Sequence, residues 1–384
     1  MKVGIVSKWI ASGQAVVARQ LRSALDDLGH ESFVLARPGS GPRAQKAASA
    51  TGGDTDAVWD QPGITKASDH HVPLSEYEDW VRANSIGLIL CDENYQFDEI
   101  NHLREQGLRT IGRFVWEYFG PEHAHGAKTA FETIYSMTLC ERERYAGMGI
   151  ESPYVPWGIH PELLDWAKDG DVAGLIKPGT PGGAAEDVAG YIPEDVAGLV
   201  RFYFPGGILG RRKPIRKVVK AFRRAQGEHL RLIISGQVPR KDEFLAEAAV
   251  EDPRIELALE DEPENAHRAR FAACDVCLAP SRWEGLGLPL YEATAFGLPV
   301  ITNDKPPMSE MVLDGLSGIL VASTPQGEAR SGITAWDPDP GELTAAIERL
   351  GDRRELERMR GGVAELREQR NWKHTVAALR ELLS

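Results

Sequence analysis

Residues 275–304 read DVCLAPSRWEGLGLPLYEATAFGLPVITND, and the order of elements in this stretch decides the fold class. The apolar run Val276–Ala279 predicts a buried β-strand. Pro289 suits the first turn of a helix and Gly297 suits the residue after its end, so a helix is expected between them. A second apolar run begins at Pro299. Strand, helix and strand in this order predict a βαβ unit and a parallel sheet.

The same alternation of short apolar runs and amphipathic stretches continues along most of the chain. The strands expected on this basis are Val3–Val6, Ser32–Leu35, Gly87–Cys91, Arg109–Val115, Thr133–Tyr135, Val200–Phe204, Arg231–Ile234, Ile255–Ala258, Val276–Ala279, Pro299–Thr302 and Gly318–Val321. The pattern predicts two successive doubly wound α/β domains. Ligands of such sheets bind beyond the carboxyl ends of the strands, so two domains that face each other would hold a ligand in the cleft between them.

The expected domain boundaries follow from the composition of the connecting segments. We expect residues 1–165 to form an N-terminal Rossmann-like domain and residues 199–369 a C-terminal one, with a last helix, 370–384, packing back on the first domain. Residues 166–198 are rich in Gly and Pro and contain Asp-Val-Ala-Gly three times. This segment is predicted to be an insertion or linker, either a surface loop or a lid or partner contact.

Composition excludes several classes of protein. The 384 residues include 44 Lys and Arg against 57 Asp and Glu, a net charge of −13. A basic excess is usual in nucleic-acid-binding proteins, so no nucleic-acid partner is expected. The chain has no uncharged apolar run of about 18 residues, so no transmembrane segment is expected. The first apolar run, Val3–Val6, is too short for a signal peptide, which predicts a cytoplasmic protein.

The cysteines do not indicate a metal site. Four cysteines are too few for the disulfide framework of a secreted protein. Cys274 and Cys277 form a C-x-x-C pair, but a zinc site needs a second pair of ligands at suitable spacing. We interpret both residues as buried structural thiols, with a redox pair as the alternative.

The loop Ser281–Leu288 is the first candidate site, because it joins the carboxyl end of a strand to the start of a helix. Gly285 and Gly287 let the backbone approach a ligand closely, and the N–H groups of a helix start suit a phosphate. Glu284 and Glu292 flank this loop. Two carboxylates would repel a phosphate and make better acceptors for sugar hydroxyl groups. The alternative is that Glu292 complements the helix dipole and Glu284 is a solvated charge.

The segment Glu284-Gly-Leu-Gly-Leu-Pro-Leu-Tyr-Glu292 resembles the E-x7-E signature of retaining glycosyltransferases of the GT-B fold, in the family-four class "glycosyl transferases group one". Flanking segments, 272–281 and 309–321, resemble the neighbouring elements of that family, so the resemblance covers roughly residues 200 to 325. It implies two Rossmann-like domains that face a central cleft, with the acceptor on the N-terminal side and the donor on the C-terminal side. It also implies retention of the anomeric configuration and no bound metal.

A basic cluster after the strand Val200–Phe204 is the second candidate site. Arg211, Arg212 and Lys213 precede a helix that starts at Pro214. Point charges beside a helix N-terminus predict a diphosphate clamp, and a solvated basic face is the alternative. The resemblance assigns the donor diphosphate to a lysine and an arginine of this turn. We take these as Lys213 and Arg212, with Arg211 as the rival of Arg212.

The N-terminal half contributes weaker candidates. Gly13 follows the first strand and resembles the family's first glycine loop, which implies a contact with the donor phosphates. Many relatives carry a histidine after a central strand of this domain, but here the corresponding strand leads into Trp116 and Glu117. We expect Trp116 and Glu117 to line the acceptor or sugar pocket, with His123 or His125 as the alternative.

The expected activity is transfer of a sugar, of the hexosyltransferase type, from a nucleotide diphosphate sugar to a hydroxyl-bearing acceptor, with no other cofactor. Lys213 and Arg212 are expected to stabilise the leaving diphosphate. Glu284 would bind the transferred sugar and Glu292 the nucleotide ribose. Backbone N–H groups near Leu286 and Gly287 would assist, and Gly285, Leu286 and Gly287 are all expected to bind the donor.

Two other classes of function stay open. One is a nucleotide-sugar epimerase or a phosphorylase on the same fold. The other is a catalytically silent homologue that acts as a binding protein. A dinucleotide-dependent dehydrogenase is disfavoured, because no G-x-G-x-x-G follows the first strand.

Overall fold

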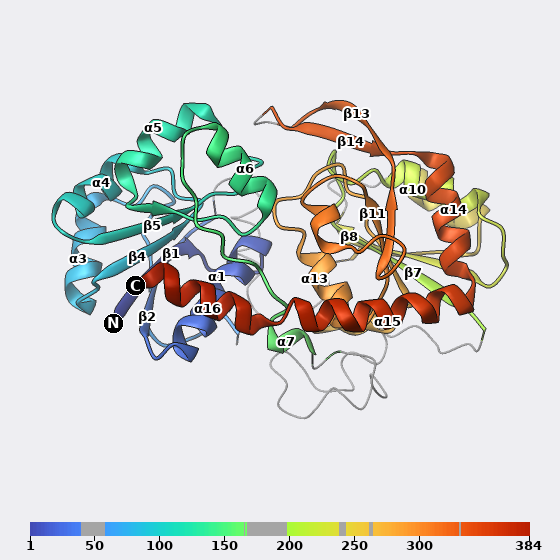
Figure 1. Cartoon of the computed structure of the whole chain (residues 1–384), viewed down its shortest axis with the longest axis horizontal. Coiled ribbons are helices and arrows are strands. Elements are labelled where there is room, and N and C mark those ends of the chain that lie inside the picture. Colours follow the sequence, from blue (N-terminus) through green and yellow to red (C-terminus); the bar gives the residue numbers. More distant parts are fainter. Residues whose placement is uncertain (40–57, 165, 167–197, 238–242, 261–263, 330–331) are drawn as a thin grey trace. The chain divides into compact units, whose positions relative to one another are not determined.

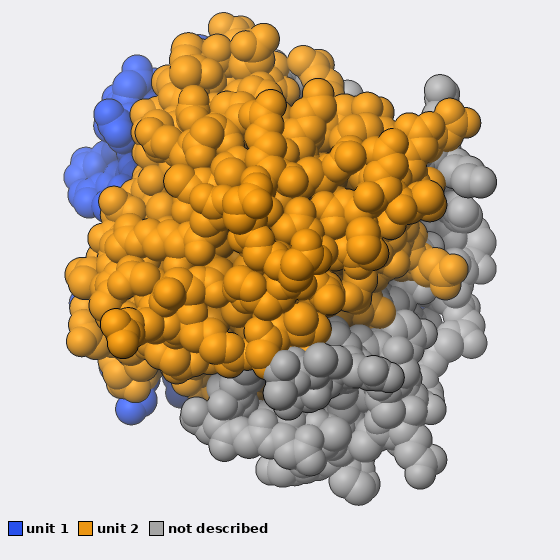
Figure 2. Space-filling model, turned by 90° about the vertical axis from the view of Figure 1, so that its right-hand side faces the viewer, with its two compact units in different colours: residues 1–158, 372–384 blue, residues 159–371 orange. Residues whose placement is uncertain are grey.

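The computed structural model describes residues 1–39, 58–164, 166, 198–237, 243–260, 264–329 and 332–384 (Figure 1). The chain divides into two compact units, coloured separately in Figure 2. Unit 1 comprises residues 1–158 and 372–384, and unit 2 comprises residues 159–371. Of the predicted insertion 166–198, only Trp166 and Gly198 lie within the described residues.

Unit 1 is a parallel sheet with helices on both faces. Its strands are β1 (Lys2–Lys8), β2 (Glu31–Arg37), β3 (Ile64–Lys66), β4 (Leu88–Asp92), β5 (Arg109–Arg113) and β6 (Thr133–Ile134). Its helices are α1 (Gly13–Asp27), α3 (Leu74–Asn84), α4 (Phe97–Glu105), α5 (Pro121–Ala130), α6 (Leu139–Gly147) and α16 (Trp372–Leu383). The last helix of the chain therefore belongs to the unit that contains the first, and α1 and α16 lie side by side (Figure 1).

The strand order of unit 1 is β3-β2-β1-β4-β5-β6, and the pairs are parallel. In register, Ile5 of β1 pairs with Val34 on one side and Leu90 on the other. The order changes direction between β1 and β4, and the carboxyl ends at such a point form a crevice for ligands. Apolar residues such as Phe114 and Phe119 fill the core beneath this edge.

Unit 2 repeats this architecture and adds a hairpin. Its strands are β7 (Val200–Ile208), β8 (Leu230–Gln237), β9 (Ile255–Ala258), β10 (Val276–Leu278), β11 (Val300–Asn303), β12 (Gly318–Val321), β13 (Ser323–Glu328) and β14 (Thr334–Pro338). Its helices are α7 (Pro161–Leu164), α10 (Ile215–Arg224), α11 (Glu243–Glu251), α12 (Glu264–Ala272), α13 (Leu288–Ala295), the short 3₁₀ helix η2 (Met308–Met311), α14 (Pro340–Gly351) and α15 (Arg353–Gln369).

The main sheet of unit 2 has the order β12-β11-β10-β7-β8-β9, again parallel, and it changes direction between β7 and β10. Helix α10 shows why the sequence folds this way. Val218, Val219 and Phe222 are buried against the sheet, whereas Lys220 and Arg223 are exposed. The predicted α/β class with two parallel sheets is confirmed.

Two features of unit 2 depart from the sequence-based expectation. Strand β7 continues to Ile208 instead of ending at Phe204, because an irregularity in its pairing with β8 between Pro205 and Ile208 accommodates Gly206 and Gly207. The antiparallel hairpin β13–β14 was not predicted. Its first strand is mostly exposed and lacks the apolar alternation that indicates a strand.

None of the described helices is both long enough and apolar enough to cross a membrane.

Candidate active site

Two loops meet at the carboxyl edge of the unit 2 sheet, where the strand order changes direction. Strands β7 and β10 are neighbours, with Phe202 opposite Val276. The loop after β7 carries Arg212 and Lys213, and the loop after β10 carries Glu284. The topology thus brings together the basic cluster and the first carboxylate of the E-x7-E segment, at the place where open α/β sheets bind ligands.

Lys213 and Glu284 form a buried ion pair. The Lys213 Nζ atom lies 2.6 Å from Oε1 of Glu284 and donates a second hydrogen bond to Oγ of Ser281, at 2.9 Å. The exposed fractions of the Lys213 and Glu284 residues are only 6% and 7%. An ammonium group carries three N–H donors, so this arrangement leaves one donor of Lys213 for a ligand.

Arg212 also faces Glu284. Its Nη1 atom lies 3.6 Å from Oε2 of Glu284, and its side chain is about one-third exposed, at 35%. Arg211 is exposed, and its backbone carbonyl accepts a hydrogen bond from Nη1 of Arg282. Of the two candidate arginines, Arg212 is therefore the one that the structure pairs with Glu284.

The cations control the ionisation of Glu284. Burial alone would raise the pKa of this carboxyl group, but Lys213 and Arg212, with hydrogen bonds from Lys213 and Ser281, outweigh burial and hold the pKa below its usual value. Glu284 is consequently ionised at neutral pH and serves as a hydrogen-bond acceptor.

The glycine loop continues into α13. Gly285, Leu286 and Gly287 are buried, and Gly287 immediately precedes the helix in the left-handed region, at φ +80°. Glycine adopts this conformation without the steric cost that a side chain would bring. The chain therefore turns sharply after Glu284, so that the first N–H groups of α13 lie at the end of this loop.

Glu292 lies in α13 in a different electrostatic environment. Burial raises its pKa to about 7, opposed by Arg268 and reinforced by Glu264 and Glu162. Arg268 is itself buried and forms ion pairs with Glu264 at 2.5 Å and with Glu162 at 3.5 Å. Sequence analysis missed Arg268, whose position in a helix outside the signature gave no signal.

Gly13 of unit 1 is the first residue of α1. The side chain of Ser12 caps this helix by accepting a hydrogen bond from the N–H of Ala15, at 3.4 Å. The next residue, Gln14, donates from Nε2 to the backbone carbonyl of Asp92, at 3.0 Å. Gly13 therefore lies at the carboxyl edge of the unit 1 sheet, between the ends of β1 and β4.

The other unit 1 candidates follow β5. Trp116 is partly buried and Glu117 is buried, both in the loop between β5 and α5. Nδ1 of His123 accepts a hydrogen bond from the N–H of Gly120, at 3.1 Å, which caps α5. The exposed His125 lies one residue beyond a buried position of the same helix. His123 thus has a structural hydrogen bond, whereas Trp116 and Glu117 lie directly beyond the strand end.

Unit 1 also contains a buried charged cluster that sequence analysis did not find. Arg113, at the end of β5, lies 3.1 Å from Oδ1 of Asp92 and 3.5 Å from Oε1 of Glu141. Glu93, the residue after Asp92, has a backbone in the left-handed region, at φ +55°. Burial and the neighbouring Asp92 raise the pKa of its carboxyl group to about 8. Two acidic residues directly after the apolar strand Leu88–Cys91 were the available signal.

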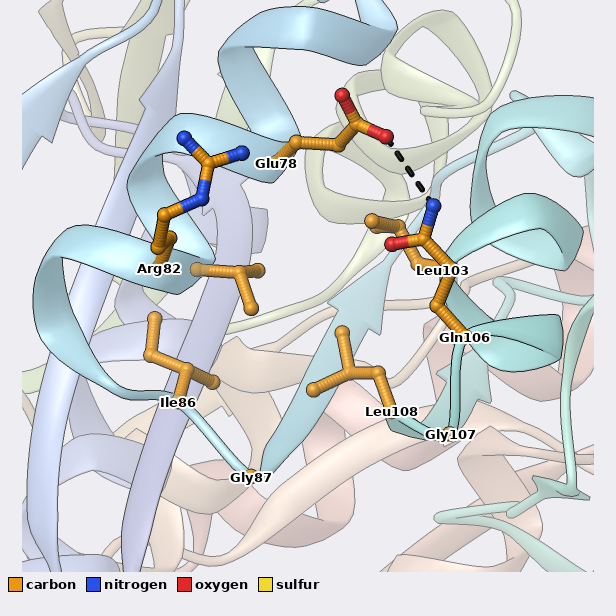
Figure 3. A pocket seen from close by; sticks show the side chains of 9 residues that line it. Glu78, Arg82, Ile86, Gly87, Leu103, Gln106, Gly107 and Leu108 are labelled. Carbon is orange, nitrogen blue, oxygen red and sulfur yellow. Dashed lines mark hydrogen bonds between the residues drawn. The ribbon is translucent and has the colours of Figure 1, made fainter.

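A pocket of unit 1 lies at the opposite, amino edge of its sheet (Figure 3). Ile86, Leu103 and Leu108 form its apolar part, and Glu78 accepts a hydrogen bond from Nε2 of Gln106 at its rim, at 3.2 Å. Figure 3 shows these side chains around the segments that precede β4 and β5. None of the predicted site residues lines this pocket.

The described part of the chain contains no group of three or more His, Cys, Asp or Glu side chains that could hold a metal ion. Cys274 and Cys277 are buried free thiols, and burial raises the pKa of Cys277 well above its usual value. A buried thiol of raised pKa is unreactive, in agreement with the structural interpretation of this pair.

Comparison with known proteins shows which family unit 2 resembles. The family model "Glycosyl transferases group 1" matches residues 203–351, which include the loops of Lys213 and Glu284 and the whole of α13. Over this segment the chain is similar to the glycosyl transferases of group 1.

Curated relatives of this group 1 segment match over part of their length. A D-inositol 3-phosphate glycosyltransferase of Nocardia farcinica is 30% identical over 177 residues, 44% of this chain and 36% of that protein. The lipopolysaccharide core biosynthesis mannosyltransferase LpsB of Rhizobium meliloti is 36% identical over 78 residues, 20% of this chain and 22% of that protein. The matched segments span between 15% and 36% of the curated relatives.

Solved structures extend the likeness to the fold of the whole chain. Sucrose-phosphate synthase of Thermosynechococcus elongatus has a TM-score of 0.71 at 16% identity, covering 100% of this chain and 98% of that chain. Anabaena HepE, solved with UDP and glucose, has a TM-score of 0.66 at 13% identity, covering 100% and 99%. The fold is that of the GT-B glycosyltransferases, as the group 1 resemblance implies.

Proposed function

We propose that this chain is a retaining glycosyltransferase that moves a sugar from a nucleoside diphosphate sugar to a hydroxyl group of an acceptor. The observation that carries the proposal is the buried contact of Lys213 with Glu284, at 2.6 Å, at the point where the unit 2 sheet changes direction. A cation and an ionised carboxylate held side by side can bind the two parts of such a donor, its diphosphate and its sugar.

Lys213 and Arg212 supply positive charge for the leaving group. During transfer the bond between the anomeric carbon and the diphosphate oxygen breaks, the acceptor oxygen bonds to the same carbon, and the hydroxyl proton leaves with the diphosphate. Negative charge grows on the diphosphate in the transition state. Ser281 and Glu284 already hold the ammonium group of Lys213 in place, so little reorganisation is needed when that charge develops.

Glu284 and Glu292 have separate roles in this proposal. Glu284 is ionised and accepts hydrogen bonds from the sugar hydroxyl groups while it keeps Lys213 oriented. Glu292, on α13, accepts hydrogen bonds from the nucleotide ribose. Gly13, Trp116 and Glu117 of unit 1 are proposed to contact the donor phosphates and the acceptor.

The identity of the donor is tested first with uridine nucleotides. Anabaena HepE was solved with UDP-glucose, and the pneumococcal O-GlcNAc transferase GtfA with UDP and GlcNAc. These complexes support a nucleoside diphosphate sugar as the donor class.

We propose that Arg212 and Lys213 of unit 2 supply the positive charge that a metal ion would otherwise supply. Transfer is then expected to continue in the presence of a chelator.

The central experiment measures donor turnover by Lys213→Ala and by the control Lys220→Ala. Lys220 is exposed on α10, in the same basic stretch. We expect Lys213→Ala to lose about 10²- to 10³-fold in kcat, as when a preorganised electrostatic donor is removed, with Lys220→Ala unchanged. Equal activity of a folded Lys213→Ala variant and the control would contradict the proposal, as would a wild-type protein that turns over no nucleoside diphosphate sugar.

A further inference from the structure

The hairpin β13–β14 is joined to the loop that carries Glu284. The backbone N–H of Trp336, in β14, donates to the carbonyl of Arg282, at 3.0 Å. The fully buried side chain of Asn303 donates from Nδ2 to the carbonyl of Ser281, at 2.9 Å, and to that of Trp336, at 2.8 Å. The hairpin thus holds Arg282 directly, and Asn303 of β11 links it to Ser281.

Asp337 links the same loop to the helix that follows the basic cluster. Its Oδ1 atom lies 2.6 Å from Nε of Arg282, and its Oδ2 atom lies 2.8 Å from Nζ of Lys217, in the first turn of α10. The residue is 8% exposed, so its carboxylate is largely withdrawn from solvent. Removing the charge of such a carboxylate leaves its two cationic partners without their counter-charge, which costs more at a withdrawn position than at the surface.

Arg282 completes the connection between the two loops. Its N–H donates to the carbonyl of Arg212, at 2.9 Å, and its Nη1 atom to the carbonyl of Arg211, at 3.2 Å. The guanidinium group also donates to the carbonyl of Gln326, in β13. Asp337 therefore fixes the orientation of a side chain that touches both the basic loop and the hairpin.

We propose that Asp337 is a positioning residue for the pair of Lys213 and Glu284. It acts through Arg282 on the loop of Glu284 and through Lys217 on the helix that follows Lys213. The proposal rests on the proposed function, which gives Lys213 the diphosphate and Glu284 the sugar. In it, the hairpin acts as a brace: through Asp337 it keeps these two side chains at a fixed distance. The proposal gives the hairpin, which was not predicted from the sequence, an indirect part in transfer through Asp337.

Asp337→Asn is the variant that tests this brace. The amide keeps the volume of the side chain and one acceptor oxygen, so the variant keeps the packing but loses the charge that holds both cations. Glu328→Gln is the matched control, because it also removes one negative charge from the hairpin. Glu328 lies in the exposed strand β13 and not at the contacts of Asp337 with Arg282 and Lys217. Misplacement of reacting groups by about 1 Å costs up to about 10²-fold in rate. We expect kcat of Asp337→Asn to fall about tenfold or more, with the donor KM within about threefold of wild type.

Hydrogen exchange supplies a readout that does not depend on the activity. We expect Asp337→Asn to speed backbone exchange in both residues 209–217 and residues 281–288, whereas Glu328→Gln leaves both segments unchanged. A merely structural role would confine the faster exchange to the hairpin or spread it over the whole of unit 2. Either of those patterns overturns the proposal, as does unchanged exchange.

The two proposals fail in distinguishable ways. If wild-type protein turns over no nucleoside diphosphate sugar, the proposed function fails, and the exchange data alone decide whether Asp337 braces the loops. If wild-type protein is active and folded Asp337→Asn retains kcat within about twofold, the positioning role fails while the function stands. Lys217→Met gives a second, milder test, because Lys217 is partly exposed, and kcat is expected to fall by less than in Asp337→Asn.

Discussion

At the scale of single residues, the two glutamates of the E-x7-E segment have opposite pKa shifts. Lys213 and Arg212 hold the pKa of Glu284 below its usual value, whereas burial raises that of Glu292 to about 7. Pairs of carboxyl groups whose pKa values are shifted in opposite directions are typical of functional sites. The surroundings of Glu284 therefore stabilise its ionised form, whereas those of Glu292 disfavour ionisation. The proposed role of Glu292 in ribose binding accounts for a glutamate at this unfavourable position.

Glu292→Gln is expected to stabilise the protein at alkaline pH. The pKa of Glu292 is higher in the folded chain than its usual value of 4.5, so between these two values the folded state holds a proton that the unfolded state has lost. The free energy of unfolding of the wild type therefore falls as pH rises from 4.5 towards 7, and a glutamine lacks this loss. From about pH 5 to about pH 8, we expect the variant to gain about 2 kcal/mol relative to wild type. Urea unfolding at the two pH values measures the gain, and a pH-independent difference would rule out the raised pKa.

At the scale of elements, helix α15 contains two adjacent glycines, Gly361 and Gly362. Only Gly362 packs against the segment that precedes β12. A Cβ atom on Gly362 would lie 2.2 Å from the backbone carbonyl oxygen of Leu316, whereas one on Gly361 would meet no atom within 4 Å. The backbone atom cannot move aside as the tip of a flexible side chain can. The two neighbouring glycines therefore have different reasons for being tolerated in a helix.

Alanine substitutions at these two positions are expected to have opposite effects. Gly361→Ala should raise the free energy of unfolding by about 0.5 to 1 kcal/mol, because alanine is the better helix former. Gly362→Ala should lower it by about 1 to 3 kcal/mol, because the added methyl group overlaps a fixed backbone. Thermal or urea unfolding of the matched pair measures both values. A stabilising Gly362→Ala would show that α15 does not pack this closely on Leu316.

At the scale of the whole molecule, the end of the chain completes the unit in which the chain begins. Thr375 of α16 accepts a hydrogen bond at Oγ1 from the N–H of Gly158, at 2.8 Å, and donates to the carbonyl of Pro156, at 2.7 Å. Trp372 and Trp157 pack edge to face, with ring centroids 4.9 Å apart. These contacts join α16 to residues 156–158 of unit 1.

Thr375→Val is expected to destabilise unit 1 in particular. Valine keeps the shape of threonine but leaves the Gly158 N–H and the Pro156 carbonyl without this partner, at a cost of about 1 to 3 kcal/mol. Hydrogen exchange should quicken in residues 1–158 and stay unchanged in residues 159–371. Faster exchange in residues 159–371 alone would show that α16 does not stabilise unit 1.

The sequence predicted the elements well where local signals exist, and the contacts between distant segments less well. Pro289 lies in the first turn of α13 and Gly297 just after its end, because helix ends have their own residue preferences. The contact of Lys213 with Glu284 needed the strand order, which periodicity alone does not reveal. The cluster around Arg113 was missed because its members come from the ends of β4 and β5 and from α6, which lie far apart in the sequence. Exposed β13 offered no apolar alternation to detect.

The most direct test of the account measures binding of nucleoside diphosphates by titration calorimetry. UDP, GDP, ADP and TDP are titrated into wild type, Lys213→Ala and the exposed-lysine control Lys220→Ala. We expect at least one of them to bind wild type and control with equal affinity. It should bind Lys213→Ala at least about tenfold more weakly, because a charge-assisted contact to the diphosphate is lost. Equal binding to Lys213→Ala, or no binding of any of the four to wild type, would contradict the claim. The claim is that the donor binds where the strand order of the unit 2 sheet changes direction.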